Sequence, residues 1–97
     1  MKLLTKELER QFPKLYEIEN TPIEEKQVIA KFFDPTGSWT WYAVEFDGED
    51  LFFGLVDGHE KEWGYFSLKE LEGIKGRWGL GIERDRYFHH KRIGDIN

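Results

Sequence analysis

The residues able to do chemistry in this 97-residue chain are carboxylates, histidines and aromatic side chains, because the sequence contains no cysteine. Glu45 lies on the second predicted strand and Glu62 begins the fourth, and Asp85 lies in a later segment that can approach them. Two carboxylates roughly 5–9 Å apart beside aromatic rings form the arrangement that cleaves glycosidic bonds. A hydrolase using these three residues is one hypothesis. Ion pairs of Glu45 with Arg84, and of Asp85 with a basic neighbour, are the simpler interpretation.

Metal and nucleophile chemistry have less support in the sequence. A zinc site needs three or four converging ligands, and the histidines His59, His89 and His90 form no such spacing. Ser38 and Ser67 are the only serines, and neither lies in a nucleophile elbow. We therefore expect no metal and no cofactor, and we favour a function that is not enzymatic.

Aromatic residues are the strongest signal, since eleven of the chain's sixteen fall between residues 31 and 66. A buried aromatic side chain contributes on the order of 150–250 Å² to a core, so a small sheet cannot hide all of these rings on one face. Exposed rings with charged neighbours are typical of interaction surfaces. The predicted binding residues are Trp39, Trp41, Glu45, Trp63, Trp78 and Asp85.

Charge favours a protein partner over a nucleic acid. The formal net charge is −5, and the turns of the predicted sheet are acidic. Binding to a phosphate backbone depends on basic contacts, and only the C-terminal run RDRYFHHKR offers them. A single-strand nucleic-acid binder that stacks bases on aromatic rings remains an alternative. We expect a cytoplasmic protein without a membrane segment, either monomeric or weakly dimeric.

The elements that must position these residues follow from local patterns. Helices are predicted over residues 5–12 and 68–73, where Thr5 and Ser67 are N-caps. Strands are predicted over residues 27–33, 39–46, 51–57 and 62–66, with short turns between them. The fold class is therefore α+β: a four-stranded antiparallel meander with two short helices packed on it. Residues 1–97 form one predicted domain, with the sheet over 27–66 and a loop, a short strand and a frayed tail over 74–97.

Alternation along residues 39–46 predicts which face of the sheet is open. Trp39, Trp41 and Glu45 share one face under strict alternation, opposite Tyr42, Val44 and Phe46. The second set is the more apolar, so we expect the helices to cover it. The first face then stays open, partly covered by Trp78 and Phe88. On this prediction, Trp41→Ala removes partner binding and costs less stability than the roughly 3–5 kcal/mol of a fully buried tryptophan, whereas Phe46→Ala does the reverse.

The segments AKFFDPTGSWTWYAVEFDGEDLFFGLV, EWGYFSLKEL and GIERDRYF, preceded by LLTKELERQFPKLYEIENTP, closely resemble a bacterial family of domains of unknown function. The resemblance covers roughly residues 3–90. It implies a small prokaryotic protein associated with plasmids, phages and other mobile elements, encoded near genes for DNA maintenance or transfer, and it implies no catalytic residue. The sequence departs from the family pattern at Leu55, where a tyrosine is usual, and at the basic run from His89 to Arg92.

Overall fold

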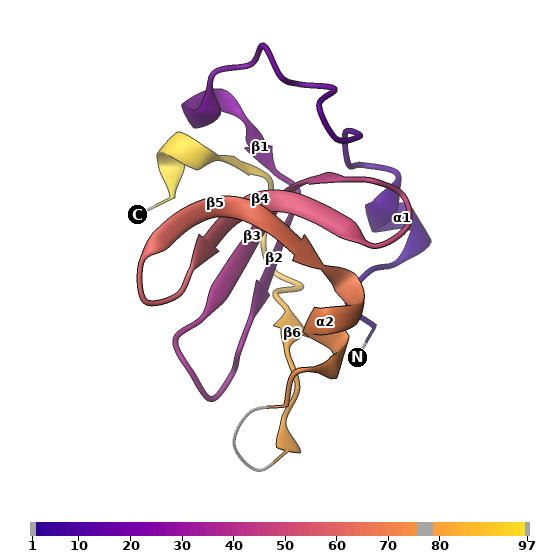
Figure 1. Cartoon of the computed structure of the whole chain (residues 1–97), viewed down its shortest axis with the longest axis vertical. Helices are drawn as coiled ribbons and strands as arrows, with labels where there is room; N and C mark the ends of the chain where they lie inside the picture. Colours follow the sequence, from indigo (N-terminus) through magenta and orange to yellow (C-terminus); the bar gives the residue numbers. More distant parts are fainter. Residues whose placement is uncertain (1, 76–78, 97) are drawn as a thin grey trace.

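Five antiparallel strands form the main sheet in the computed structural model, which describes residues 2–75 and 79–96. Their order across the sheet is β5-β4-β3-β2-β6 (Figure 1). The strands are β2 (Ala30–Phe33), β3 (Thr40–Phe46), β4 (Leu51–Asp57), β5 (Lys61–Ser67) and β6 (Glu83–Arg84). Strands β2 to β5 pair in chain order, as the predicted meander requires, and β6 adds a fifth strand beside β2. The α+β class with an antiparallel sheet is confirmed.

The C-terminal segment, predicted to be a frayed tail, forms one strand of a separate two-stranded ribbon. Strand β1 (Gln27–Val28) pairs antiparallel with β7 (Lys91–Arg92). The predicted strand over residues 27–33 is consequently divided between β1 and β2, which pair with different partners. The tail is held because Ile93 and Ile96 pack against a hydrophobic cluster of the sheet, a contact that local sequence patterns do not reveal.

The structure also contains short helices and 3-10 turns: α1 (Lys6–Glu9), η1 (Ile23–Glu25), α2 (Leu68–Gly73) and η3 (Ile93–Asp95). Helix α2 occupies the range predicted for it, and the Ser67 hydroxyl accepts the amide of Glu70 at 3.2 Å. Helix α1 begins after its Thr5 cap but is shorter than the predicted 5–12. The amides of Gln11 and Phe12 each bond to a carbonyl three residues back, so the last turn tightens and the α-helix ends.

A β-bulge in β3 interrupts the alternation of side chains in the middle of the sheet. Ala43 lies opposite Gly54 of β4, whereas Glu45 lies opposite Phe53, so the register shifts between them. Val44 is the extra residue. Because an inserted residue reverses the phase of a strand, side chains after the bulge point to the face opposite to the one that strict alternation predicts.

The bulge decides which residues share a face. Trp41 and Phe46 belong to one hydrophobic cluster, and Tyr42 and Val44 belong to another. Glu45 lies on the Tyr42 face. Its partner on β4, Phe53, lies on the same face, where its ring stacks on Trp63. The expectation that Trp41 and Glu45 share a face, with Phe46 opposite, is therefore wrong, because the alternation was counted through a bulge.

The first hydrophobic cluster lies between the sheet and the two α-helices. Its buried members are Leu3, Leu4, Ala30, Phe32, Trp41, Ala43, Phe46, Phe52, Phe66, Leu71 and Ile82. Leu8 of α1 and Leu68 of α2 pack against it, and Figure 1 shows both helices to one side of the curved sheet. The helices thus cover the face of Trp41 and Phe46, and the predicted assignment of covered and open faces is inverted.

The second hydrophobic cluster lies on the other face and is smaller. Its buried members are Val28, Tyr42, Val44 and Leu55. Ile18 covers it from the connector after α1, and Phe88, Ile93 and Ile96 cover it from the C-terminal segment. Neither face of the sheet is therefore fully open. What remains accessible on the second face is the part carried by β4 and β5.

Gly54 lies where β4 passes close to the backbone of β3, and its replacement tests this close approach. A Cβ atom at Gly54 would overlap the carbonyl oxygen of Tyr42. Gly54→Ala should lower the free energy of unfolding by about 1–3 kcal/mol, the usual cost of overpacking, as measured by urea denaturation. Gly64→Ala is the matched control, because Gly64 faces Gly54 across the ladder and a Cβ there meets no atom within 4 Å. Equal losses in the two variants would contradict the close approach.

Asp50, in the turn before β4, connects that turn to the start of α2. Its Oδ2 accepts the Ser67 hydroxyl and its Oδ1 accepts the amide of Lys69 at 2.9 Å. The Ser67 hydrogen bond, followed by that from Lys69, holds the pKa of Asp50 below its ordinary value. The carboxylate therefore stabilises the folded state above the unfolded pKa of about 4, and this contribution is lost as the pH falls through the lower folded pKa.

Asp50→Asn should accordingly be less stable than the wild type at neutral pH, and the difference should shrink in acid. The reason is that the wild type loses its carboxylate charge in acid, whereas the amide has none to lose. Urea midpoints of both proteins, measured from neutral pH down to about pH 2, check this expectation. A difference that stays constant over the whole range would exclude a role for the Asp50 charge.

Candidate functional site

Four aromatic side chains form a surface on the second face of the sheet, and we call Tyr16, Phe53, Trp63 and Tyr65 the aromatic surface. The Phe53 ring stacks on Trp63 with centroids 5.5 Å apart and meets Tyr65 at 5.1 Å. Tyr16 and Tyr65 are 64% and 50% exposed. Phe53 and Trp63 are half-buried.

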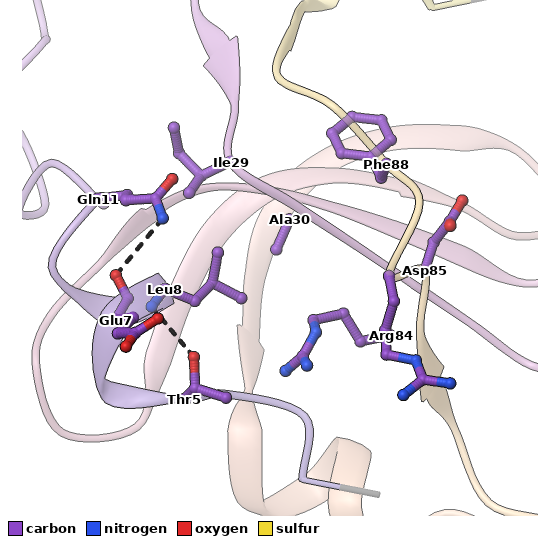
Figure 2. A pocket seen from close by; sticks show the side chains of 10 residues that line it. Thr5, Glu7, Leu8, Gln11, Ile29, Ala30, Arg84, Asp85 and Phe88 are labelled. Atoms are coloured by element: carbon purple, nitrogen blue, oxygen red, sulfur yellow. Dashed lines mark hydrogen bonds between the residues drawn. The ribbon is translucent and has the colours of Figure 1, made fainter.

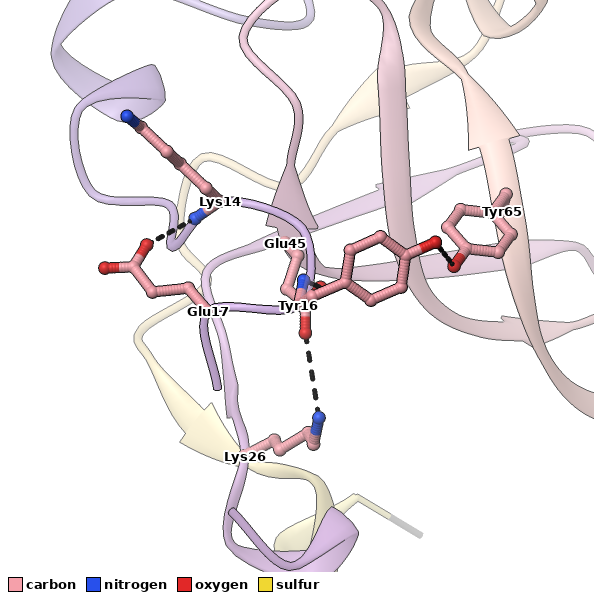
Figure 3. Close-up of polar contacts among 6 residues, drawn as sticks. All are labelled: Lys14, Tyr16, Glu17, Lys26, Glu45 and Tyr65. Atoms are coloured by element: carbon pink, nitrogen blue, oxygen red, sulfur yellow. Dashed lines mark hydrogen bonds and ion pairs between the residues drawn. The ribbon is translucent and has the colours of Figure 1, made fainter. Parts of the chain in front are cut away.

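Tyr16 is held in place by bonds at both ends of the residue, as Figure 3 shows. Its amide donates to Glu45 Oε1 at 3.0 Å, and its hydroxyl oxygen lies 2.9 Å from that of Tyr65, 49 positions away in the sequence. Its backbone φ is +69°, in the left-handed region that costs a non-glycine residue about 1–2 kcal/mol. The connector thus maintains a strained conformation that presents the Tyr16 ring beside β5.

Below these rings lies a buried ion pair. Lys26 Nζ is 3.6 Å from Glu45 Oε2, and the two side chains are only 9% and 5% exposed (Figure 3). A pocket of about 150 Å³ adjoins the pair and is lined by Tyr16, Glu19, Lys26, Glu45, Phe53 and Tyr65. The lining contains two carboxylates and one ammonium group, so the pocket carries an excess negative charge.

The hydroxyl of Tyr65 is protonated at neutral pH. Its hydrogen bond with the Tyr16 hydroxyl, followed by loss of hydration, raises the pKa of Tyr65 above its ordinary value. The negative charge of Glu45 acts in the same direction. Tyr65 therefore remains protonated and can serve as a hydrogen-bond donor within the aromatic surface.

Of the predicted binding residues, only Trp63 and Glu45 lie at this site, and Glu45 is beneath the surface. Trp41 is 8% exposed and belongs to the first hydrophobic cluster, so it forms no part of an open face. Trp39, which immediately precedes β3, is 37% exposed, and its ring meets those of Trp41 and His59. Trp78 lies outside the described residues.

The three carboxylates of the hydrolase hypothesis are not brought together. Glu62 faces Val56 and Glu45 faces Phe53, three positions along an unbroken β4 ladder, so the two acids point to opposite faces of the sheet. Asp85 instead pairs with Lys31, at 3.9 Å. The arrangement required for glycosidic cleavage by these residues is therefore absent.

Arg84 is not a partner of Glu45, because it fastens the N-terminal segment instead. Its guanidinium donates to the carbonyls of Lys2 and Leu3, each at 2.9 Å. Arg84 also lines a pocket of about 280 Å³ between α1 and β6 (Figure 2). There the Thr5 hydroxyl accepts the amide of Leu8 and the Gln11 side chain donates to a carbonyl of α1. These polar groups make hydrogen bonds that stabilise α1. The pocket is therefore a weaker candidate site than the aromatic surface.

Sequence reasoning missed Tyr16, Lys26, Phe53 and Tyr65. Alternation along residues 61–67 places Trp63 and Tyr65 on one face, and this signal could have identified Tyr65. No local signal indicates Tyr16 or Lys26, since both reach the sheet from the irregular connector.

The comparisons with known proteins add a family but no activity. A family model described as "Protein of unknown function (DUF2958)" matches residues 3–93. No curated protein and no solved structure matches the chain. Within the described residues, no group of three or more histidine, aspartate or glutamate side chains is placed to hold a metal ion. No helix in the described part of the chain is long and apolar enough to cross a membrane.

Proposed function

Because the chain belongs to the DUF2958 family, whose description assigns no activity, we propose a function from the site: a small non-catalytic interaction module that binds a protein partner through the aromatic surface. The observation that carries the proposal is the exposure of Tyr16 and Tyr65 in a fixed arrangement. The few residues that carry most of the binding energy of protein interfaces are enriched in tryptophan, tyrosine and arginine. A ring that is fixed before binding loses less conformational entropy on association.

The strained backbone of Tyr16 supports this proposal. Backbone strain of about 1–3 kcal/mol persists where the surroundings enforce it, and such residues cluster at functional sites. Tyr16 is mostly exposed, so its ring gains little from burial in exchange for this strain. The residues that enforce the conformation, Glu45 and Tyr65, both belong to the site.

Charge suggests the chemistry of the partner. Glu17 and Glu19 lie in the connector around Tyr16, and the whole chain carries a formal net charge of −5. A basic patch on the partner would complement this acidic surrounding and accelerate association. On the sequence resemblance described above, we place the module in the cytoplasm of a bacterium, acting with a DNA-handling protein in the maintenance or transfer of mobile elements.

Replacement of Tyr65 tests the proposal. Tagged wild-type protein is used to capture proteins from a lysate of the organism that carries the gene, and the captured proteins are identified by mass spectrometry. For a partner so identified, Tyr65→Ala should weaken binding at least about tenfold, because a central tyrosine is typical of a hot spot. Isothermal titration calorimetry with the purified partner measures the loss.

Tyr87→Ala is the matched control, because Tyr87 is 86% exposed and does not belong to the aromatic surface. It should bind the partner as the wild type does. Failure to recover any protein reproducibly, or a partner that binds Tyr65→Ala normally, would contradict the proposal. Binding of labelled single-stranded DNA at low salt that is lost in Tyr65→Ala would instead favour the nucleic-acid alternative.

A further inference from the structure

Strand β5 is an edge strand of the main sheet. It pairs with β4 along its whole length from Lys61 to Ser67, and no strand of the described residues lies on its other side. An unpaired edge of this length offers a row of backbone donors and acceptors to another strand. The edge lies next to the aromatic surface, which includes Trp63 and Tyr65.

The pairing with β4 determines which backbone groups of β5 point outward. At the two ends of the ladder, the Gly58 amide donates to the Glu60 carbonyl at 3.2 Å and the Leu68 amide donates to the Asp50 carbonyl at 2.8 Å. Hydrogen-bonded and non-bonded pairs alternate in an antiparallel ladder. The even-numbered residues of β5 therefore bond to β4. The outward groups belong to the odd-numbered residues Lys61, Trp63 and Tyr65.

The side chains of these residues are complementary when two copies of β5 are related by a two-fold axis at Trp63. An antiparallel copy of β5 in this register places Lys61 opposite Tyr65 of the second copy, and Trp63 opposite the same residue. Glu62 then faces Gly64 on the other side of the sheet, so that no like charges oppose one another. Cross-strand neighbours of this kind stabilise a sheet.

Other registers are less favourable. An axis at Glu62 opposes two carboxylates, and an axis at Lys61 opposes two ammonium groups; both arrangements are destabilising. An axis at Gly64 requires Lys61 to pair with Ser67, whose side chain already caps α2. The register centred on Trp63 uses residues 61–65 alone and leaves the helix cap intact.

Charge also favours this register. The Lys61 ammonium reaches the exposed ring of Tyr65 in the second copy, and aromatic faces attract cations. The Tyr65 ring lines the pocket in which Glu19 and Glu45 outnumber Lys26. We propose that two copies of this chain pair through the free edges of β5, forming one continuous sheet and joining their aromatic surfaces. The dimer goes beyond the proposed function and does not depend on the partner considered there.

Analytical ultracentrifugation of the full chain, from low micromolar to near-millimolar concentration, tests the dimer. The mass should rise with concentration from 11.6 kDa toward twice that value. Lys61→Glu should raise the dissociation constant at least about tenfold, because it places a carboxylate against the acidic pocket of the second copy. Lys6→Glu is the matched control: it makes the same charge change on an exposed residue of α1 and should leave the dimer unchanged.

Hydrogen exchange of individual amides identifies the interface. In the dimer, the amides of Lys61, Trp63 and Tyr65 should become protected as the concentration rises, whereas those of Glu62 and Gly64 should be protected at every concentration. A mass that stays monomeric throughout overturns the proposal. So does a dimer that Lys61→Glu leaves intact, or one in which the three odd-numbered amides still exchange rapidly. None of these outcomes bears on whether the aromatic surface binds a different protein.

Discussion

Trp41→Ala should lower the free energy of unfolding by about 3–5 kcal/mol, the cost of truncating a buried aromatic side chain. Phe46→Ala should cost a similar amount. Trp41 and Phe46 are 8% and 4% exposed, and both belong to the cluster that the helices cover. Strict alternation in β3 predicts unequal effects, since it places the two residues on opposite faces. Because the bulge places both residues on one face, the two substitutions should lower the free energy of unfolding by similar amounts.

Urea denaturation followed by circular dichroism measures both losses. Trp39→Ala is the matched control on the same strand end, because Trp39 is 37% exposed and leaves a smaller cavity. Its loss should be clearly smaller than that of Trp41→Ala. If Trp41→Ala costs no more than Trp39→Ala, while Phe46→Ala unfolds the protein, then the helices cover the opposite face and the bulge is misplaced.

Lys26→Met should be destabilising by about 3–5 kcal/mol, because it leaves the carboxylate of Glu45 buried without its ammonium partner. Both side chains are almost completely buried, so bulk water solvates the unpaired carboxylate poorly. The amide of Tyr16 still donates to Glu45, but one neutral donor does not compensate a full charge. The connector that presents Tyr16 should loosen in the same variant.

The double variant Lys26→Met with Glu45→Leu separates the two causes of this loss. Replacing both members of a buried pair by apolar residues is often nearly neutral, so the double variant should recover most of the stability that Lys26→Met loses. It also removes the acceptor for the Tyr16 amide, which should lower affinity for the proposed partner. A double variant as unstable as Lys26→Met would show that packing of the lysine stem, rather than the charge of Glu45, causes the loss.

Local sequence patterns determined much of the fold. Helix α2 lies where the Ser67 capping box predicts it, and β4 spans the predicted residues 51–57. The order of the four meander strands also follows, because short turns between neighbouring strands leave only antiparallel pairing. Each of these features is determined by residues within a few positions of one another, so local sequence patterns are sufficient to predict it.

The tertiary structure alone decided the faces of the sheet and the residues of the site. One extra residue at Val44 reverses every later side chain of β3. Glu45 thereby lies beneath the aromatic surface, and Phe46 lies in the first hydrophobic cluster. The contacts of Tyr16 with Glu45 and Tyr65 join positions 29 and 49 residues apart. Such contacts depend on strand register and on the path of an irregular connector. A shift of one residue reverses the face, so neither composition nor periodicity can specify them.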